Sequence, residues 1–170
     1  MPAQKSLLDK PDDRLVINTG PLIALTRIDA LEIVLQLPLN LMCPEQVRQE
    51  LEIGTKRGLP FAFPDGLTVV SLERPLEMVA SVTLDAGEAA VIQLAIEKDI
   101  QTVCIDERRG RQVATAVGLN VVGTLGLLLR AKTEGIIDAV RPFVLRLLAA
   151  GIWYDQKLIA RVLESTGEDL

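Results

Sequence analysis

The segment TVCIDERRGRQVATAVGLNVVGT, residues 102–124, contains two short apolar runs separated by a stretch with helical spacing. The runs, Thr102 to Ile105 and Asn120 to Val122, are rich in β-branched residues, which favour strands. Gly118 precedes the second run and is typical of a helix end. This segment therefore predicts a strand, a helix and a second strand, which is the repeating unit of a parallel sheet.

Three similar runs occur earlier in the chain, at Leu15 to Ile17, Asn40 to Cys43 and Leu67 to Leu72. All five runs are apolar at successive positions instead of alternating, as strands must be when helices cover both faces of their sheet. Segments with helical spacing separate most of them. We therefore predict a three-layer α/β/α sandwich.

The helix boundaries are marked by capping residues, prolines and glycines. We expect helix starts at Pro21, Pro44, Asp85 and Thr124, and helix ends at Gly118 and Gly135. The helix predicted over Ala86 to Lys98 has an apolar stripe of Ala89, Ile92 and Ile96, which should pack on the sheet. After Gly123 we expect mainly helices, with a break at 151–155 and a last helix ending near Ser165; the loop 54–66 is the least regular stretch.

Length and composition are those of one domain. The 170 residues are 49% hydrophobic but only 3% aromatic, which suits an aliphatic core between helices and a sheet. We expect a flexible tail over 1–13 and a single domain over 14–170. Both cysteines, Cys43 and Cys104, lie in apolar runs and are predicted to be buried. The N-terminal stretch lacks the apolar core of a signal peptide, so we expect a cytoplasmic protein with no membrane association.

Histidine is absent from the chain, which narrows the chemistry available to it. Ser-His-Asp and Cys-His catalysis are excluded, and zinc would lack one of its usual ligands. A metal would have to be bound through oxygen, which favours Mg²⁺ or Mn²⁺. The net charge of −5 would repel phosphate, so a nucleic-acid substrate would need a metal or local basic patches.

Polar residues lie where the predicted strands end, which is where open parallel sheets bind ligands. These candidates are Asn18, Glu50, Glu88, Asp106 and the neighbouring Glu107. Two carboxylates about 4 Å apart repel by roughly 4 kcal/mol at an effective dielectric constant of about 20, so a cluster of acids favours a bound cation. Such a cation could orient water and neutralise charge on a phosphodiester. Each acid also has a structural alternative: Asp85 and Glu88 match a capping box, Asp106 could cap the following helix, and Glu50 could face solvent.

Basic residues follow the last of these acids. Arginine is unfavourable in the first turn of a helix, because its charge opposes the helix dipole. Arg108 and Arg111 are therefore expected to have a role, either in binding phosphate or in pairing with the acids. Lys56 and Arg57 in the irregular loop could extend this basic rim. We predict all four as RNA contacts.

In the order and spacing of its motifs the chain resembles the PIN-domain family, in particular a prokaryotic branch of nucleic-acid-binding proteins related to toxins of the virulence-associated protein C type. The motifs are listed here in chain order: LVINTGPLIALTRI, CPEQVRQEL, LDAGEAAVIQLA, CIDERRGRQVA and GLNVVGTLGLLLRAKTEGII. The resemblance implies strand order 3-2-1-4-5, metal-dependent ribonuclease activity, frequent neutralisation by an antitoxin protein, and homodimers. It also implies that Glu50, Glu88 and Asp106 are the acids of the site.

One position departs from the family pattern, because Asn18 stands where the resemblance implies a leading Asp. An amide oxygen can bind Mg²⁺, but it has no charge and cannot act as a base. Two readings therefore stay open: a toxin-type endoribonuclease weakened by Asn18, and an impaired module that binds RNA or a protein. A phosphoacceptor domain is disfavoured because the chain lacks an acidic pair near the first strand, and a dinucleotide-binding fold because no G-x-G-x-x-G follows it.

Overall fold

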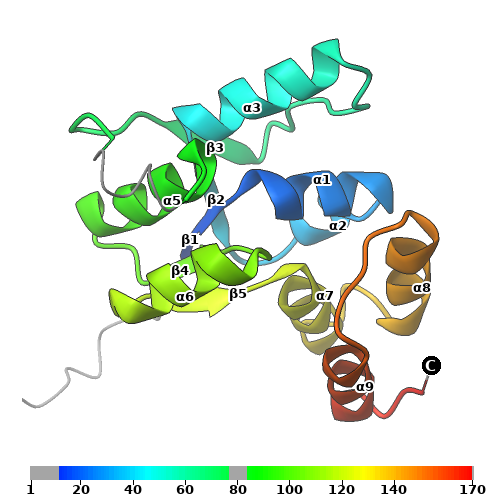
Figure 1. The fold of residues 1–170 in the computed structure, drawn as a ribbon. Helices are drawn as coiled ribbons and strands as arrows, with labels where there is room; N and C mark the ends of the chain where they lie inside the picture. Colours follow the sequence, from blue (N-terminus) through cyan, green and yellow to red (C-terminus); the bar gives the residue numbers. More distant parts are fainter. Residues whose placement is uncertain (1–11, 77–83, 170) are drawn as a thin grey trace, which may run out of the picture.

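The computed structural model describes residues 12–76 and 84–169, and its centre is a five-stranded parallel sheet (Figure 1). The strands are β1 Arg14–Ile17, β2 Asn40–Pro44, β3 Leu67–Val70, β4 Thr102–Cys104 and β5 Asn120–Val122. They lie in the order β3-β2-β1-β4-β5, and each neighbouring pair is parallel. The predicted sheet and its order are confirmed, although β3 and β4 end earlier than expected.

Both faces of this sheet are covered. In the central strand β1, the consecutive residues Leu15, Val16 and Ile17 are all buried. Successive side chains of a strand point to opposite faces, so β1 must be covered on both sides. The helices are α1 Thr19–Arg27, α2 Leu31–Val34, α3 Glu45–Lys56, α5 Ala86–Glu97, α6 Arg108–Ala116, α7 Thr124–Thr133, α8 Arg141–Ala149 and α9 Gln156–Ser165.

The helices around the sheet form two packed groups. Helix α5 contacts the central strands β1, β2 and β4, and it is flanked by α3 and α6. Helices α1, α2 and α7 pack against one another (Figure 1). With both faces of the sheet covered, the arrangement is the predicted α/β sandwich.

Most predicted helix boundaries agree with the structure. Asp85 caps α5 by accepting a hydrogen bond from the Glu88 backbone N–H at 2.7 Å. Gly118 and Gly135 follow the ends of α6 and α7 with positive φ angles of 88° and 73°, which glycine adopts without strain. The expected helix start at Pro44 is wrong, because Pro44 is the last residue of β2 and α3 begins at Glu45.

Helix α5 also differs from the predicted amphipathic helix. Every residue from Gly87 to Ala95 is buried, whereas Ile96, expected on the sheet-facing stripe, is 51% exposed. The sheet lies on one side of α5, and α3 and α6 cover its flanks, so no polar face is needed. The helix consequently carries Glu88 into the interior.

Glu168 links the C-terminal helices through hydrogen bonds. Its carboxylate accepts hydrogen bonds from Lys132 Nζ at 2.7 Å and from the backbone N–H groups of Val140 and Arg141 at 3.0 and 2.9 Å. These contacts link the end of the chain to α7 and to the start of α8. The break predicted at 151–155 is present between α8 and α9.

Two further expectations concern burial and membranes. Cys43 and Cys104 are buried free thiols, as predicted, and burial raises the pKa of Cys43 to about 12. Among the described helices, none is both long and apolar enough to cross a membrane. The expected flexible tail over 1–13 lies almost entirely outside the described residues.

Candidate functional site

Asn18 lies at the carboxyl end of the central strand. Its backbone N–H donates to the Cys104 carbonyl at 3.0 Å, which extends the β1–β4 pairing by one residue. The side chain is only 4% exposed, and its Oδ1 has no hydrogen-bond partner among the described residues. A buried carbonyl oxygen without a partner is costly, so this atom requires a ligand or water.

Glu50 faces the same edge of the sheet from the middle of α3. Its Oε2 accepts a hydrogen bond from Thr19 Oγ1 at 2.5 Å. The carboxylate also lies against Gly87, where an added Cβ would come within 2.6 Å of Oε2. Glu50 is therefore oriented by the residue next to Asn18 and by α5, and the alternative of a fully solvated side chain is wrong.

Glu88 is the most buried of the candidate acids. It is 4% exposed, and its Oε1 is buried without a hydrogen-bond partner in the described part of the chain. A Cβ at Gly110 would lie 2.7 Å from this oxygen, so the start of α6 closes over it. Burial, the largest cause, acts together with the negative charges of Asp85, Glu107 and Glu50 to raise the pKa of Glu88 to about 7. The acids are thus close enough to repel one another.

Asp106 lines the same groove as Asn18, and its carboxylate is hydrogen-bonded to α7 and to Tyr154. Its Oδ1 accepts from the Thr124 backbone N–H at 2.8 Å, and its Oδ2 accepts from Thr124 Oγ1 at 2.6 Å and from the Tyr154 hydroxyl at 3.3 Å. These bonds attach the end of β4 to the start of α7. The expected cap on the following helix α6 is not formed, because Glu107 is the N-cap residue there and makes no side-chain cap.

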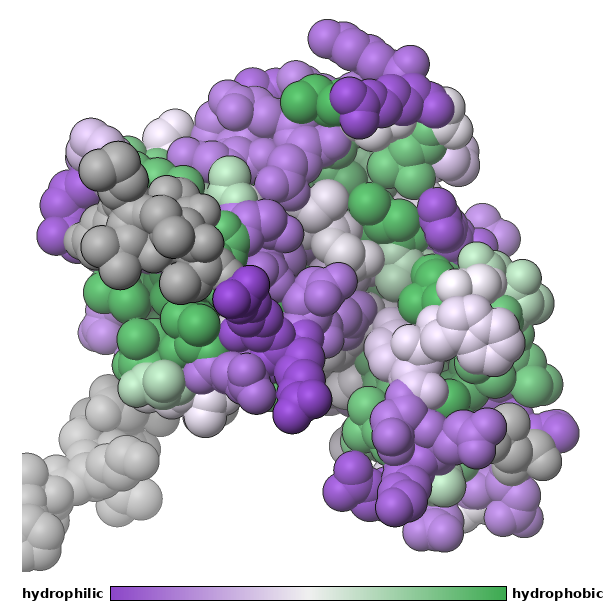
Figure 2. Space-filling view, in the orientation of Figure 1, coloured by the Kyte–Doolittle hydropathy of each residue, from purple (hydrophilic) through white to green (hydrophobic). Residues whose placement is uncertain are grey.

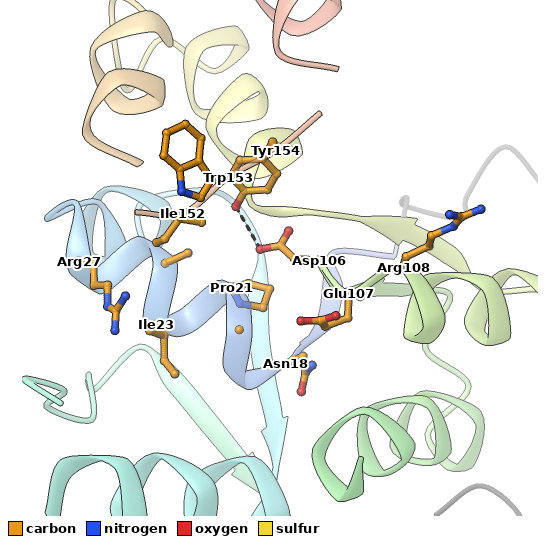
Figure 3. A pocket seen from close by; sticks show the side chains of 12 residues that line it. Asn18, Pro21, Ile23, Arg27, Asp106, Glu107, Arg108, Ile152, Trp153 and Tyr154 are labelled. Carbon is orange, nitrogen blue, oxygen red and sulfur yellow. Dashed lines mark hydrogen bonds between the residues drawn. The ribbon is translucent and has the colours of Figure 1, made fainter. Parts of the chain in front are cut away.

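The side chain of Glu107 points away from the side chain of Asp106 (Figure 3). Figure 3 shows Asp106 directed toward Tyr154 and Glu107 directed away from it. Glu107 is exposed, lines the same groove as Asn18, and contributes to the raised pKa of Glu88. Both acids line the groove with Asn18, but of the two only Glu107 contributes to the raised pKa of Glu88.

The predicted RNA-contacting residues fall into separate places. Arg108 is exposed on the groove. Arg111 donates from its guanidinium to the Ile105 carbonyl at 2.8 Å and so supports the end of β4. Lys56 and Arg57 are exposed at the C-terminal end of α3, and Figure 1 shows that end pointing away from α5 and α6. The structure does not bring these two residues to the acids.

The groove itself includes residues that the sequence did not single out. It has a volume of about 380 Å³, and Arg27, Ile152, Trp153 and Tyr154 line it together with the residues at the ends of β1 and β4. Figure 2 shows the surface hollowed between α6 and the segment that joins α8 to α9. Burial and the neighbouring Asp106 carboxylate raise the pKa of Tyr154, so its hydroxyl stays protonated as a donor.

The donor chemistry of this edge fits a divalent cation that prefers oxygen. Two buried oxygens, Asn18 Oδ1 and Glu88 Oε1, have no protein partner among the described residues, and the Glu50 carboxylate lies beside Glu88. Over residues 12–76 and 84–169, no three acidic or cysteine side chains are already close enough to hold one ion. An amide oxygen would thus have to complete the ligand set.

The sequence was also compared with protein families. Residues 14–168, nearly the whole described chain, match the sequence profile of the PIN domain. The chain belongs to the PIN domain family. This assignment agrees with the order of the five strands and confirms the family inferred from the sequence motifs.

PIN domains are typically metal-dependent nucleases and generally use divalent metals. The oxygen-only set of this PIN domain is consistent with that use. No protein with a curated description matches the chain.

Proposed function

We propose that this PIN domain is a metal-dependent endoribonuclease of toxin type. The observation that carries the proposal is the pair of buried, unpartnered oxygens, Asn18 Oδ1 and Glu88 Oε1, at the carboxyl edge of the sheet. A protein interior rarely leaves such atoms unsatisfied, and functional sites are the usual exception. The negative charges of Asp85, Glu107 and Glu50, which contribute to the raised pKa of Glu88, add a second reason for a cation at this place.

Asn18, Glu50 and Glu88 are the residues that would hold Mg²⁺ or Mn²⁺, with Glu107 on the open side. The bound cation would supply charge neutralisation for the phosphodiester and a lowered pKa for an attacking water. Thr19 orients Glu50 through its hydroxyl, and Gly87 and Gly110 leave room for the two carboxylates. Asp106, hydrogen-bonded to Thr124 and Tyr154, holds the start of α7 in place beside the site.

The leading Asn18 makes this site less negative than one with an aspartate there. An amide binds a divalent cation more weakly than a carboxylate and cannot accept a proton. We therefore expect weak cleavage and a requirement for high metal concentrations.

The second candidate function is a PIN-fold module that binds RNA or a protein without cutting. Asn18 is the observation that favours it, since the amide removes one negative charge from the ligand set. In either case the resemblance to toxins suggests an antitoxin protein as partner and a homodimer as the assembled form.

The test is cleavage of a single-stranded RNA of mixed sequence with Mn²⁺ and, separately, with excess EDTA. Endonucleolytic fragments that need the metal, and that disappear in Glu88→Gln but not in Glu164→Gln, would support the proposal. Glu164 is exposed on α9 and serves as the matched control. Metal-dependent binding without fragments, even in Asn18→Asp, would instead favour the binding module.

A further inference from the structure

The segment between α8 and α9 presents an isolated tryptophan to solvent. Trp153 is 77% exposed, which is the largest value among the exposed large hydrophobic side chains of the described residues. It is also the single tryptophan of the chain. Its side chain borders two hollows, one shared with Asn18 and Glu107 and one lined by Arg111 and Leu158.

The backbone that carries Trp153 is held on both sides. The Ile152 N–H donates to the Leu147 carbonyl at 2.9 Å, and the Tyr154 hydroxyl donates to Asp106 at 3.3 Å. Asp155 then caps α9 by accepting from the Lys157 N–H at 2.8 Å. An exposed indole on a fixed backbone is a preorganised apolar plane, because little ordering is needed when a ligand packs on it.

Two arginines flank the groove below this plane. Arg27 at the end of α1 and Arg108 at the start of α6 both line it, and Figure 3 shows them on opposite sides with Asn18 and Glu107 between. Neither guanidinium makes an ion pair or a hydrogen bond with another residue in the described part of the chain. In a protein of net charge −5, they are local sites for an anion next to the acidic edge.

We propose that this groove binds single-stranded nucleic acid, with one base stacked on Trp153 and the adjoining phosphates on Arg27 and Arg108. The proposal rests on the proposed nuclease function, because it places the strand beside Asn18 and Glu107. Stacking on an indole requires an accessible base face, which a single strand offers and a duplex does not. An aromatic plane above a groove flanked by two guanidiniums, both without a partner among the described residues, fits alternating bases and phosphates better than it fits an apolar protein surface.

The experiment measures binding separately from cleavage, in excess EDTA. Strands of about ten nucleotides, as single-stranded RNA, single-stranded DNA and duplex RNA, are titrated into the full chain while its intrinsic fluorescence is recorded. Because Trp153 is the sole tryptophan, quenching of the tryptophan emission reports contact at this residue. Labelled strands followed by anisotropy give the affinities of Trp153→Ala, Trp153→Phe, Arg27→Ala and Arg108→Ala.

We expect quenching by single strands and none by the duplex. Trp153→Ala should weaken single-strand binding about tenfold, and Trp153→Phe should recover most of the loss. Arg27→Ala and Arg108→Ala should each lower the salt dependence of log K by about 0.7, whereas Arg161→Ala, exposed on α9, should leave it unchanged. Comparison of the RNA and DNA arms shows which sugar the groove accepts.

Equal binding by the parent and Trp153→Ala would overturn the proposal, as would tighter binding of the duplex. A shift from dimer to monomer in Trp153→Ala, without quenching by nucleic acid, would assign the indole to a protein interface and would also overturn it. These outcomes are distinct from failure of the nuclease proposal, in which single strands quench Trp153 but no metal yields fragments.

Discussion

The carboxylate of Glu50 occupies the space that a side chain would take at Gly87. A Cβ at residue 87 would lie 2.6 Å from Oε2 and 2.7 Å from Oε1, so α3 and α5 can approach this closely only with glycine there. The same arrangement recurs between Glu88 and Gly110. The acidic edge is therefore built by pairs in which a glycine on one helix admits a carboxylate from another.

Gly87→Ala should displace the Glu50 carboxylate and reduce Mn²⁺ binding while the fold is retained. The free energy of unfolding, measured by urea denaturation, should change little, because the clash is with the flexible end of Glu50 and alanine favours the helix more than glycine does. Gly126→Ala is the matched control, since its Cβ would meet nothing closer than Val122 at 3.6 Å. If Gly87→Ala bound Mn²⁺ as tightly as the parent, Glu50 would not belong to the site.

Asn18→Asp should raise the affinity for Mn²⁺ by at least about tenfold, because one added charge near a cation is worth several kcal/mol at an effective dielectric constant of about 20. Without metal the same change should lower the melting temperature, since it adds a carboxylate close to the buried Glu88 and to Glu107. Calorimetry with and without Mn²⁺ measures both effects. An unchanged affinity in a folded variant would show that residue 18 does not contact the metal.

Asp106→Asn should act mainly on stability. It disturbs the hydrogen bonds from Thr124 and Tyr154, and we expect a loss of about 1–3 kcal/mol in the free energy of unfolding. Glu107→Gln, at the exposed neighbouring position, should leave stability nearly unchanged but weaken Mn²⁺ binding. If Asp106→Asn instead weakened Mn²⁺ binding and Glu107→Gln did not, Asp106 would be a principal ligand, as the sequence predicts.

Glu168 should make the protein sensitive to acid. Burial alone would raise its pKa, but hydrogen bonds from Lys132, Val140, Arg141 and Thr166 together lower it from 4.5 to about 2. The folded state therefore binds this proton less readily than the unfolded chain, so the stabilisation is complete above about pH 4.5 and is lost as the pH falls toward about 2. Urea denaturation across this range should show a shallower pH dependence in Glu168→Gln than in Glu164→Gln. Identical slopes would contradict the role given to Glu168.

The fold was predictable from local patterns, whereas the orientation of the site residues was not. The run Leu15 to Ile17 is apolar at successive positions because it forms a buried strand. Glycines such as Gly118 and Gly135 end helices because they adopt positive φ angles, which is a local property. The directions in which the Asp106 and Glu107 side chains point depend instead on Thr124 and Tyr154, which are distant in the sequence and bind the Asp106 carboxylate. Such contacts between distant segments cannot be predicted from the spacing of residues along the sequence.

The other differences between the predicted and the observed site concern which side chains are buried. Glu88 matched a capping box by spacing, and Asp85 does accept the Glu88 N–H, yet the Glu88 carboxylate lies in the interior because α3 and α6 flank α5. Trp153 carried no signal in the sequence, since an aromatic residue is ordinarily expected inside and only the packed structure shows it outside.

The most direct measurement of the central claim, a divalent cation held by Asn18, Glu50 and Glu88, is thermal unfolding of the parent chain during a Mn²⁺ titration. Ligand binding to the folded state stabilises by mass action, by about 2.7 kcal/mol when the free metal reaches about 100 times its Kd. We predict that the melting temperature rises with Mn²⁺ in the parent and in Glu164→Gln, and that Glu88→Gln melts higher than the parent without metal but gains little from it. A parent that melts at the same temperature with and without Mn²⁺, or a Glu88→Gln variant stabilised as much as the parent, would contradict the account.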